Sequence, residues 1–573
     1  MTRRTIAALL VGALLLAGCA KVPTSGPVEA GRGGRPEGVR GQEPIQVFAQ
    51  RPQAGWTPAQ VVSGFLAAMA TPSDGDEVAR AYLTPDVRAG WPAAKDPAVR
   101  VYAQDDDFRL EVGRDDTVTI TATERATVSN SGEYQPSPEG TTMEAVFRMQ
   151  RVNGQWRIGS LPNTKMMSAY DAVSAYSPFD AYFFAKESNV LVPSPIVLPA
   201  ADRDDWPTDL TRALINGPQG SVAPGVASAI PSDTVLESSP TIDDNGRLTV
   251  QLGGGAVGLT GARRARMIAQ LTATLLRIEG VSEVDVEIDG DNAVYGSSAF
   301  SAYEPARVVT AKRGYFINDD NELVAVDASA ADVEPLAGPF GTGALTFVKP
   351  AISLDGRRAA ALSVNGDDLW VGALNEKGKP TQLYNGKELS APSWDRNGNL
   401  WVVENAESGP RLLRFTDGRG EPVEVEAEGL EGLHVSSVRV SWDGVRIAFA
   451  VGSGDAGELR TAVLDRDGDG GISVRNVRPV APSLTAVDDV WWYDGRTLAV
   501  AAREQSDLRA SYLVSVDGLS LRKASSVRDL DAVAAGTGLP LLVTDHDGRV
   551  AISQPDEFSS TTVGSGHSPA YPG

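Results

Sequence analysis

Residues 391–403 read "APSWDRNGNLWVV", and this pattern decides the architecture of the C-terminal half of the chain. A tryptophan precedes an aspartate-containing turn that ends in glycine, and an apolar run follows the turn. Such a turn supplies the positive φ that a β-hairpin needs, and the apolar run is typical of a strand that packs on a neighbouring sheet. The related segments are "GYFINDDNELVAV" (314–326), "AISLDGRRAAAL" (351–362), "VSWDGVRIAFA" (440–450), "VWWYDGRTLAV" (490–500) and "TDHDGRVAI" (544–552).

The spacing of these segments predicts a β-propeller. Four-stranded propeller blades are built from about 40–50 residues each. We therefore predict that residues 306–573 form an all-β propeller of five to seven blades, with six as the best count. We also expect a strand near 306–312 to complete the last blade. The turn residues used as markers are Asp355, Asn397, Asp443, Asp494 and Asp547, with Asp320 as an earlier and looser member.

The N-terminus predicts an export signal and a lipid anchor. Arg3 and Arg4 precede an apolar run of about a dozen residues, which is too short to cross a bilayer of ~30 Å. Leu16-Ala17-Gly18 ahead of Cys19 resembles the lipobox of bacterial lipoproteins, at whose cysteine the chain is cleaved and acylated. We predict a signal peptide over 1–18 and lipidation of Cys19; the alternative is an ordinary secretory signal in which Cys19 is incidental. Residues 19–45 are rich in Gly, Pro and charge and are expected to form a flexible tether.

Composition excludes several kinds of chemistry. The formal net charge is −22 and grows more negative once the signal arginines are removed, so nucleic acid is not an expected partner. Cys19 is the only cysteine of 573 residues, which rules out an internal disulfide. With that thiol acylated, zinc sites of Cys/His spacing and cysteine–histidine catalysis are also excluded. We predict no catalytic residues and no cofactor.

Two small α+β domains are expected between the tether and the propeller. Residues 46–170 begin with a helix capped by Thr57, followed by strands that include a hairpin at Asn153-Gly154. The order of helices and then a curved sheet resembles the cone-shaped folds of the nuclear-transport-factor-two-like type. Residues 171–305 contain strands, a short helix, a long amphipathic helix ended by Gly280 and a final strand "VSEVDVEIDG". This series resembles the GerMN domain of bacterial envelope proteins.

A glycine-rich loop in the second domain matches a dinucleotide-binding pattern. Gly253, Gly255 and Gly258 give G-x-G-x-x-G ahead of a helix, and Glu279 and Glu283 follow where such a site would place an acid. The preceding strand is expected to belong to a hairpin and not to begin a βαβ unit. We therefore predict a flexible strand-to-helix loop, or one edge of a groove for a partner, and not a dinucleotide site.

The propeller holds one candidate metal site and few other reactive groups. Asp465, Asp467 and Asp469 occupy positions 1, 3 and 5 of a calcium-like loop, but position 12 is Asn476 and no helices flank it. A solvated hairpin tip is the expected structure, with Ca²⁺ binding as the alternative. His434 is expected on an inner blade strand and His546 in a turn, both with structural roles. The tryptophans at blade positions, Trp394, Trp401, Trp442, Trp491 and Trp492, are expected in the core.

In this order, the lipobox, the α+β domain, the GerMN-like domain and the propeller resemble the actinobacterial lipoprotein LpqB family. The resemblance implies a plasma-membrane lipoprotein on the extracytoplasmic face, with diacylglycerol and an N-acyl chain on Cys19. It also implies binding to the extracellular domain of a sensor kinase, in the MtrA–MtrB two-component system, with effects on cell division and envelope homeostasis. The alternative from another class is a cell-wall glycan-binding or hydrolytic protein that uses the propeller face.

Overall fold

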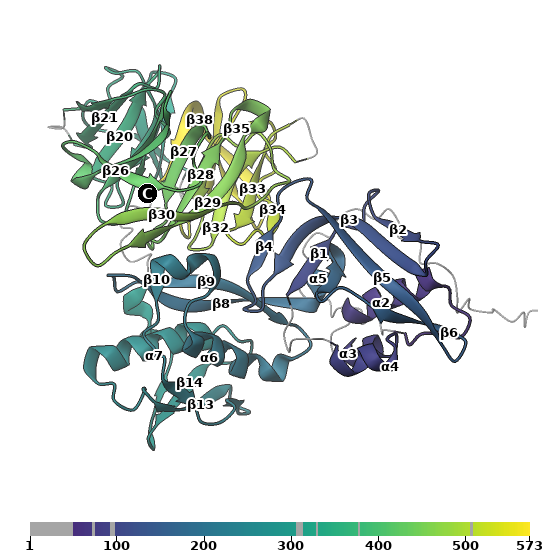
Figure 1. The fold of residues 1–573 in the computed structure, drawn as a ribbon. Coiled ribbons are helices and arrows are strands. Elements are labelled where there is room, and N and C mark those ends of the chain that lie inside the picture. Colours follow the sequence, from purple (N-terminus) through teal and green to yellow (C-terminus); the bar gives the residue numbers. More distant parts are fainter. Residues whose placement is uncertain are drawn as a thin grey trace, which may run out of the picture. The chain divides into compact units, whose positions relative to one another are not determined.

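The N-terminal domain is a bent, mostly antiparallel sheet with helices against one face, and β1 and β7 are its parallel pair (Figure 1). In the computed structural model, residues 50–70, 75–91, 98–304, 313–327, 331–375, 379–504 and 508–573 are described. Strand β3 pairs with β5 through its first half and with β1 through its second, which bends the sheet. The elements are α2 (Pro58–Ala70), α3 (Gly75–Arg80), α4 (Pro85–Gly90), β1 (Val99–Tyr102), β2 (Arg109–Val112), β3 (Thr117–Val128), β4 (Tyr134–Pro136), β5 (Thr142–Val152), β6 (Gln155–Ser160) and β7 (Lys165–Ser168).

Local sequence explains where these elements begin and turn. The backbone N–H of Thr57 donates to Gln60 Oε1 at 2.9 Å, and the Gln60 N–H donates to Thr57 Oγ1 at 3.3 Å. This reciprocal pair is a capping box, so the predicted start of α2 is confirmed. Asn153 and Gly154 both have positive φ, 51° and 77°, which confirms the predicted hairpin turn between β5 and β6.

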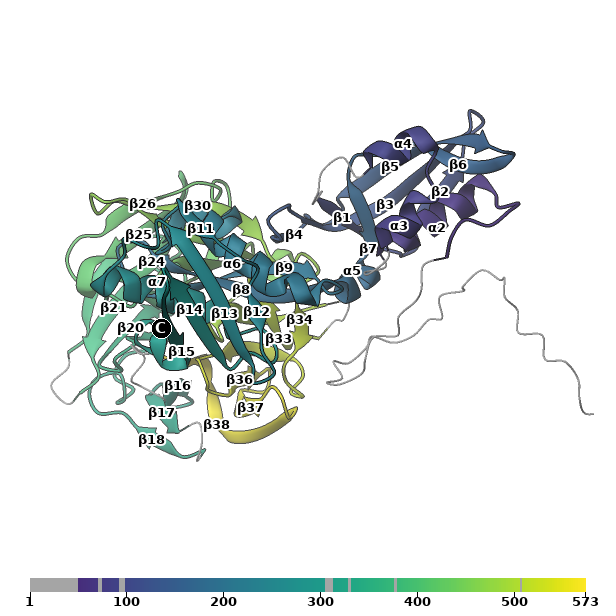
Figure 2. The same ribbon diagram turned by 90° about the horizontal axis from the view of Figure 1, so that it is seen from below.

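The GerMN-like domain follows α5 (Ala169–Ala175), and the predicted boundary between residues 170 and 171 falls inside that helix. One long hairpin, β8–β9, and one mixed sheet enclose its helices. Figure 2 shows β13 and β14 side by side. The elements are β8 (Tyr176–Ala185), β9 (Leu191–Pro199), η1 (Arg203–Asp205), α6 (Trp206–Asn216), η2 (Gly220–Gly225), β10 (Val226–Ala227), β11 (Thr234–Leu236), β12 (Thr241–Ile242), β13 (Arg247–Gly254), α7 (Gly261–Leu275), β14 (Glu283–Ile288), β15 (Asp291–Tyr295), η3 (Ser297–Ala299) and η4 (Ser301–Tyr303).

Two details of this domain differ from the sequence prediction. Helix α7 ends at Leu275, five residues before Gly280, because hydrogen bonds from the Arg277 and Ile278 amides to Thr274 and Leu275 close tighter turns there. The predicted final strand is also followed by another, since β14 turns back into β15 through Asp289 and Gly290, both at positive φ.

The C-terminal part is a six-bladed propeller, which confirms the predicted class and the best blade count. Six inner strands contact one another in a closed ring: β38, β19, β23, β27, β31 and β35. The last strand, β38, closes the ring, because residues 559–565 pair with β37 in the sixth blade and 566–570 pair with β16 in the first. The strand expected near 306–312 lies outside the described residues.

The propeller strands fall into successive groups of four. The first two blades comprise β16 (Arg313–Asn318), β17 (Leu323–Asp327), β18 (Val333–Pro335), β19 (Phe347–Ile352), β20 (Arg358–Ser363), β21 (Asp368–Ala373) and β22 (Thr381–Asn385). The third and fourth comprise β23 (Ser393–Trp394), β24 (Leu400–Ala406), β25 (Gly409–Phe415), β26 (Val423–Ala427), β27 (Val435–Val440), β28 (Arg446–Val451), β29 (Glu458–Arg466) and β30 (Ile472–Pro479). The last two comprise β31 (Val490–Trp492), β32 (Thr497–Ala502), β33 (Ala510–Ser515), β34 (Leu521–Lys523), β35 (Leu530–Ala534), β36 (Leu541–Asp545), β37 (Arg549–Gln554) and β38 (Ser559–Ala570).

The repeated motif marks the turn between the first two strands of the four central blades. Asp320 and Asp547 are exceptions, because they lie in the next turn of their blades, between β16 and β17 and between β36 and β37. This offset lengthens the spacing between Asp494 and Asp547 and shortens the spacing between Asp320 and Asp355. The motif tryptophans join neighbouring blades: Trp394 Nε1 donates to Ala351 O at 3.2 Å, and Trp492 Nε1 donates to Arg439 O at 3.1 Å.

Candidate functional site

The GerMN-like domain and the propeller share one apolar core. Val445 and Val463 of the propeller are buried within the core cluster of the GerMN-like domain. The η2 backbone approaches these side chains so closely that a Cβ added at Gly225 would lie 2.6 Å from Val445 Cγ1 and 2.7 Å from Val463 Cγ1. Only glycine leaves room for this approach. The two domains are therefore in direct apolar contact at this point.

A buried arginine adds a polar contact to this interface. The side chain of Arg446 on β28 is 5% exposed, and its Nη1 lies 3.3 Å from Oδ2 of the fully buried Asp443. Its Nη2 donates a hydrogen bond to the carbonyl oxygen of Pro193 on β9. A buried charge is costly unless it is paired and hydrogen-bonded, and both conditions are met here. Arg446 thus holds the β8–β9 hairpin against the propeller.

Two further ion pairs cross the same boundary. Asp180 Oδ2 lies 3.1 Å from Arg496 Nη1, and Lys186 Nζ lies 2.8 Å from Asp465 Oδ1. Burial raises the pKa of the Asp180 carboxyl above its ordinary value, while the charge of Arg496 opposes that rise. Asp180 is therefore a buried acid whose charged form depends on its arginine partner.

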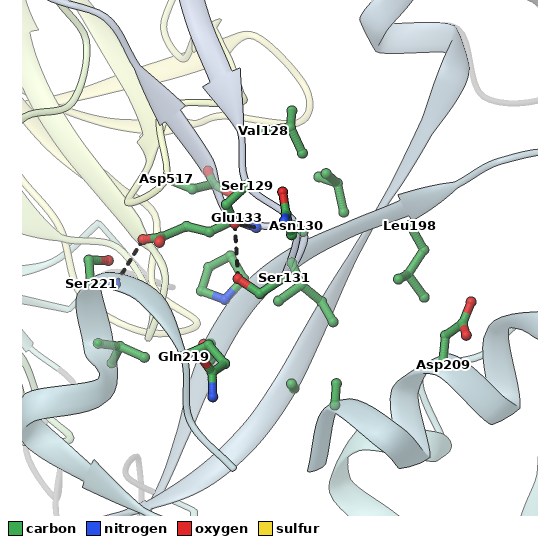
Figure 3. A pocket seen from close by; sticks show the side chains of 18 of the residues that line it. Val128, Ser129, Asn130, Ser131, Glu133, Leu198, Asp209, Gln219, Ser221 and Asp517 are labelled. Atoms are coloured by element: carbon green, nitrogen blue, oxygen red, sulfur yellow. Dashed lines mark hydrogen bonds between the residues drawn. The ribbon is translucent and has the colours of Figure 1, made fainter. Parts of the chain in front are cut away.

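A cavity opens where three domains meet. This junction cavity has a volume of about 630 Å³. Its walls come from the β3–β4 loop, from β9 and α6, and from the propeller strands β28, β29 and β30. Figure 3 shows the β3–β4 loop on one side and Leu198 and Asp209 on the opposite side. The residues labelled there are Val128, Ser129, Asn130, Ser131, Glu133, Leu198, Asp209, Gln219, Ser221 and Asp517.

Both polar and apolar side chains line this cavity, and together they determine which kind of ligand could bind in it. Its lining combines carboxylates, amides and hydroxyls with aliphatic side chains such as Leu198 and Ile196, and with the guanidinium groups of Arg446 and Arg478. Burial lowers the pKa of Arg478, and the Glu133 carboxylate opposes that effect. The arrangement suits hydrogen-bonded recognition of a polar group.

Comparison with known proteins gives the family. The model "Lipoprotein LpqB, N-terminal domain" matches residues 51–173, and "Sporulation and spore germination" matches 180–294. The model "Lipoprotein LpqB beta-propeller domain" matches 321–572. A Streptomyces coelicolor protein named Lipoprotein LpqB is 32% identical over all of this chain and 98% of its own length. This chain belongs to the lipoprotein LpqB family.

One further relative and one solved structure also align with this chain. The Thermobifida fusca protein named Lipoprotein LpqB is 29% identical over 98% of this chain and 97% of its own length. The solved structure of TolB from Acinetobacter baumannii aligns with 51% of this chain and 84% of that chain, at 13% identity and a TM-score of 0.32. The name lipoprotein carried by the relatives implies a membrane-anchored protein.

Cys19, which is predicted to be acylated, lies outside the described residues. Its acylation stays a prediction. Within the described part of the chain, no helix is both long and apolar enough to span a membrane.

The three candidate calcium ligands are not brought together as a set. Asp465 is at the end of β29, where its carboxylate pairs with Lys186. Asp467 Oδ1 accepts the Gly471 N–H at 2.5 Å, which closes the turn towards β30. Asp469 lies in the turn itself. Among the described residues, no group of three or more His, Cys, Asp or Glu side chains is arranged to hold a metal ion.

The glycine-rich loop has a different setting from the one expected. Strand β13 forms the predicted hairpin with β12, but it is also parallel to β14 with α7 between them. The loop therefore does begin a βαβ unit, and the prediction that it would not was wrong. Glu283 nevertheless pairs in register with Arg247 at the start of β13, while Gly253 and Gly255 lie at or just beyond its end. The acid and the glycines are thus at opposite ends of the sheet, and the two halves of the dinucleotide pattern do not meet.

The histidines of this LpqB-family chain lie apart from one another. His434 precedes β27 and is not on it; its Nε2 lies 3.4 Å from Glu388 Oε2. His546 is in a turn, 3.5 Å from Asp531 Oδ1. All five tryptophans predicted in the core are buried there.

Sequence reasoning missed Glu133, Asp180 and Arg446. One signal for Arg446 was present, because the third residue after the turn aspartate is arginine both in "DGRR" (355–358) and in "DGVR" (443–446). That recurrence could have marked Arg358 and Arg446 as equivalent positions. Glu133 and Asp180 have no repeat partner that would single them out.

Proposed function

We propose that this LpqB-family protein is a lipid-anchored regulator on the extracytoplasmic face of the plasma membrane. It binds the extracellular domain of an MtrB-like sensor kinase and modulates the output of that two-component system. Through this output it affects cell division and envelope homeostasis. Its role is binding and not catalysis.

The observation that carries this proposal is the way the domains are joined. The shared core around Val445 and Val463, and the buried contact of Arg446 with Pro193, make the GerMN-like domain and the propeller a single rigid scaffold. A rigid scaffold keeps the surface it presents to a partner organised before binding, which lowers the entropic cost of association. This supports recognition of another protein over a broad surface.

The glycan-binding or hydrolytic alternative has less support. The tryptophans that could have formed a sugar-stacking platform are 0–6% exposed and pack in the propeller core. His434 and His546 each face one carboxylate, Glu388 and Asp531, at separate places on the propeller. The two histidines therefore do not come together in one site.

Binding of the purified chain, residues 47–573, to the purified kinase extracellular domain tests the proposal. We expect saturable binding by calorimetry, with a dissociation constant of about 1 mM or tighter, since both proteins would be held on one membrane. Deletion of the gene should also change phosphorylation of the cognate response regulator. Absence of binding together with unchanged phosphorylation would overturn the proposal.

A further inference from the structure

The carboxylate of Glu133 lies where the three domains meet. Glu133 belongs to the N-terminal domain and is only 8% exposed. Its Oε1 accepts the backbone N–H of Ser221 in the GerMN-like domain at 3.0 Å (Figure 3), and lies 3.8 Å from Nη1 of Arg478 in the propeller. Its Oε2 accepts Nε2 of Gln135 at 2.9 Å. One side chain therefore connects the N-terminal domain to both of the others.

A stiff loop presents this side chain. The Ser129 N–H donates to Glu133 O at 2.9 Å, and the Glu133 N–H donates to Ser129 Oγ at 3.1 Å, so the loop between β3 and β4 is closed twice. Gly132 has a φ of 80°, and its carbonyl oxygen accepts the Val197 N–H of β9 at 2.8 Å. The backbone of this loop is thus fixed by its own hydrogen bonds and by one hydrogen bond from β9.

The receiving surface is shaped for a carboxylate. Gly220 has a φ of 69°, and a Cβ at this position would lie 2.1 Å from Glu133 Oε2. Any other residue would push the carboxylate away. Arg478 is largely buried, and its Nη1 has no hydrogen-bond partner among the described residues. Glu133 is the larger of the two acidic charges that oppose the burial of this guanidinium, and Asp517 is the other. Loss of the Glu133 charge would leave the desolvated guanidinium less compensated.

The two interfaces of the scaffold differ in size. The GerMN-like domain and the propeller share a large apolar core, as described above. The N-terminal domain contacts them through the β3–β4 hairpin, where Glu133 and Gly132 bind, and through a smaller apolar cluster in which Val197 of β9 is buried and against which Leu519 of the propeller packs. Domains move relative to one another unless their interface is large and apolar. The N-terminal domain is therefore the part of the chain that separates most readily.

We propose that Glu133 is a latch that reversibly holds the N-terminal domain against the other two. When the latch is closed, the three domains act as one body around the junction cavity. When it opens, the N-terminal domain moves about the linking helix α5, and the cavity widens between the β3–β4 loop and β9. This conformational device goes beyond the proposed function and does not depend on which partner the protein binds.

Spin-label distance measurements test the latch directly. The chain over residues 47–573 contains no cysteine, so labels can be attached at cysteines introduced at Glu139 and Asp244. Both positions are exposed, the first in the N-terminal domain and the second in the GerMN-like domain. The parent chain should give one narrow distance distribution. Glu133→Ala should broaden it about twofold or more, and Glu133→Gln, which keeps the acceptor oxygen but loses the charge, should fall between them.

A matched control separates latch opening from unfolding. Glu144→Ala removes an exposed carboxylate from β5 of the same domain and should leave the distribution unchanged. Gly220→Ala would displace the Glu133 carboxylate by adding a Cβ beside it, and should broaden the distribution as Glu133→Ala does. A narrow, unshifted distribution in both latch variants would overturn the proposal, and so would a broad distribution in the parent chain.

Hydrogen exchange gives a second readout. The Ser221 amide donates to Glu133, so its exchange should speed up about tenfold in Glu133→Ala. Amides of β3 and β5 should keep their protection, because the N-terminal domain remains folded. Equal exchange at Ser221 in the variant and the parent would contradict the latch. Loss of protection in β3 and β5 would show unfolding of the domain, and would equally overturn the proposal.

Discussion

Asp180 of β8 and Arg496 of the β31–β32 hairpin form an ion pair of 3.1 Å across the boundary between the GerMN-like domain and the propeller. Asp180 is nearly buried, whereas Arg496 reaches it from a partly exposed turn. The arginine therefore supplies the charge that allows a carboxylate to remain ionised in a desolvated place. Asp180 and Arg496 make the domain boundary sensitive to a single substitution and to pH.

Arg496→Ala should destabilise the protein by about 2 kcal/mol, because it leaves the buried Asp180 carboxylate without its partner. Denaturant unfolding of residues 47–573 measures this loss. Arg522→Ala is the matched control: it removes an arginine of the same blade whose pair with Asp556 is exposed, so its effect should be at most about 0.5 kcal/mol. Equal effects of the two substitutions would contradict the role given to Arg496.

The free energy of unfolding should depend on pH through the titration of Asp180. Burial raises the pKa of Asp180 above its ordinary value of 3.8, although Arg496, Arg277 and Arg446 oppose the rise. The folded state thus binds the proton more tightly than the unfolded state. The stability that Asp180 contributes is complete below pH 3.8 and is lost as the pH rises through the raised pKa.

Comparison with Asp180→Asn isolates the pH-dependent contribution of Asp180 to stability, since the amide does not titrate. Relative to that variant, the free energy of unfolding of the parent should fall as the pH rises from about 4 to 7. Denaturant unfolding at several pH values in this range measures the difference. A constant difference between the two proteins across the range would show that Asp180 has no raised pKa.

Gly225→Ala should weaken the joint between the GerMN-like domain and the propeller. The added Cβ would lie 2.6 Å from Val445 Cγ1 and 3.1 Å from Leu464 O, so the domains must shift apart. Overpacking of this kind costs about 1–3 kcal/mol, which thermal unfolding would show as a lower midpoint. Gly258→Ala, in the same domain, has open space around its Cβ and should leave the midpoint nearly unchanged.

Local sequence signals explain why so much of the fold was predictable. Helix α2 was found because Thr57 and Gln60 cap it within one turn. The blades were found because each Asp-Gly turn satisfies its own backbone, as when Asp494 Oδ1 accepts the Arg496 N–H at 2.8 Å. Contacts this short in sequence leave a pattern that repeats from blade to blade.

The candidate site could not be read in the same way. Glu133 acts through Ser221, which is 88 positions away, and Arg446 acts through Pro193, which is 253 positions away. Nothing in the residues around either side chain encodes its partner. The wrong prediction for the glycine loop has a similar origin. Strands β13 and β14 pair in parallel although the helix α7 separates them in the sequence, so the residues near the loop do not show this pairing.

Cys19→Ala tests the lipid anchor. If the acylated cysteine is the sole attachment, its loss should move most of the protein from the membrane fraction to the soluble fraction, since two or more acyl chains account for stable binding. The uncleaved signal peptide could itself retain this variant, so a second form should place residue 20 directly after a conventional secretory signal. Fractionation and immunoblotting measure the distribution of all three proteins, and mass spectrometry of the parent's N-terminal peptide should show the lipid on Cys19. Membrane retention of the second form would mean that another part of the chain holds the protein there.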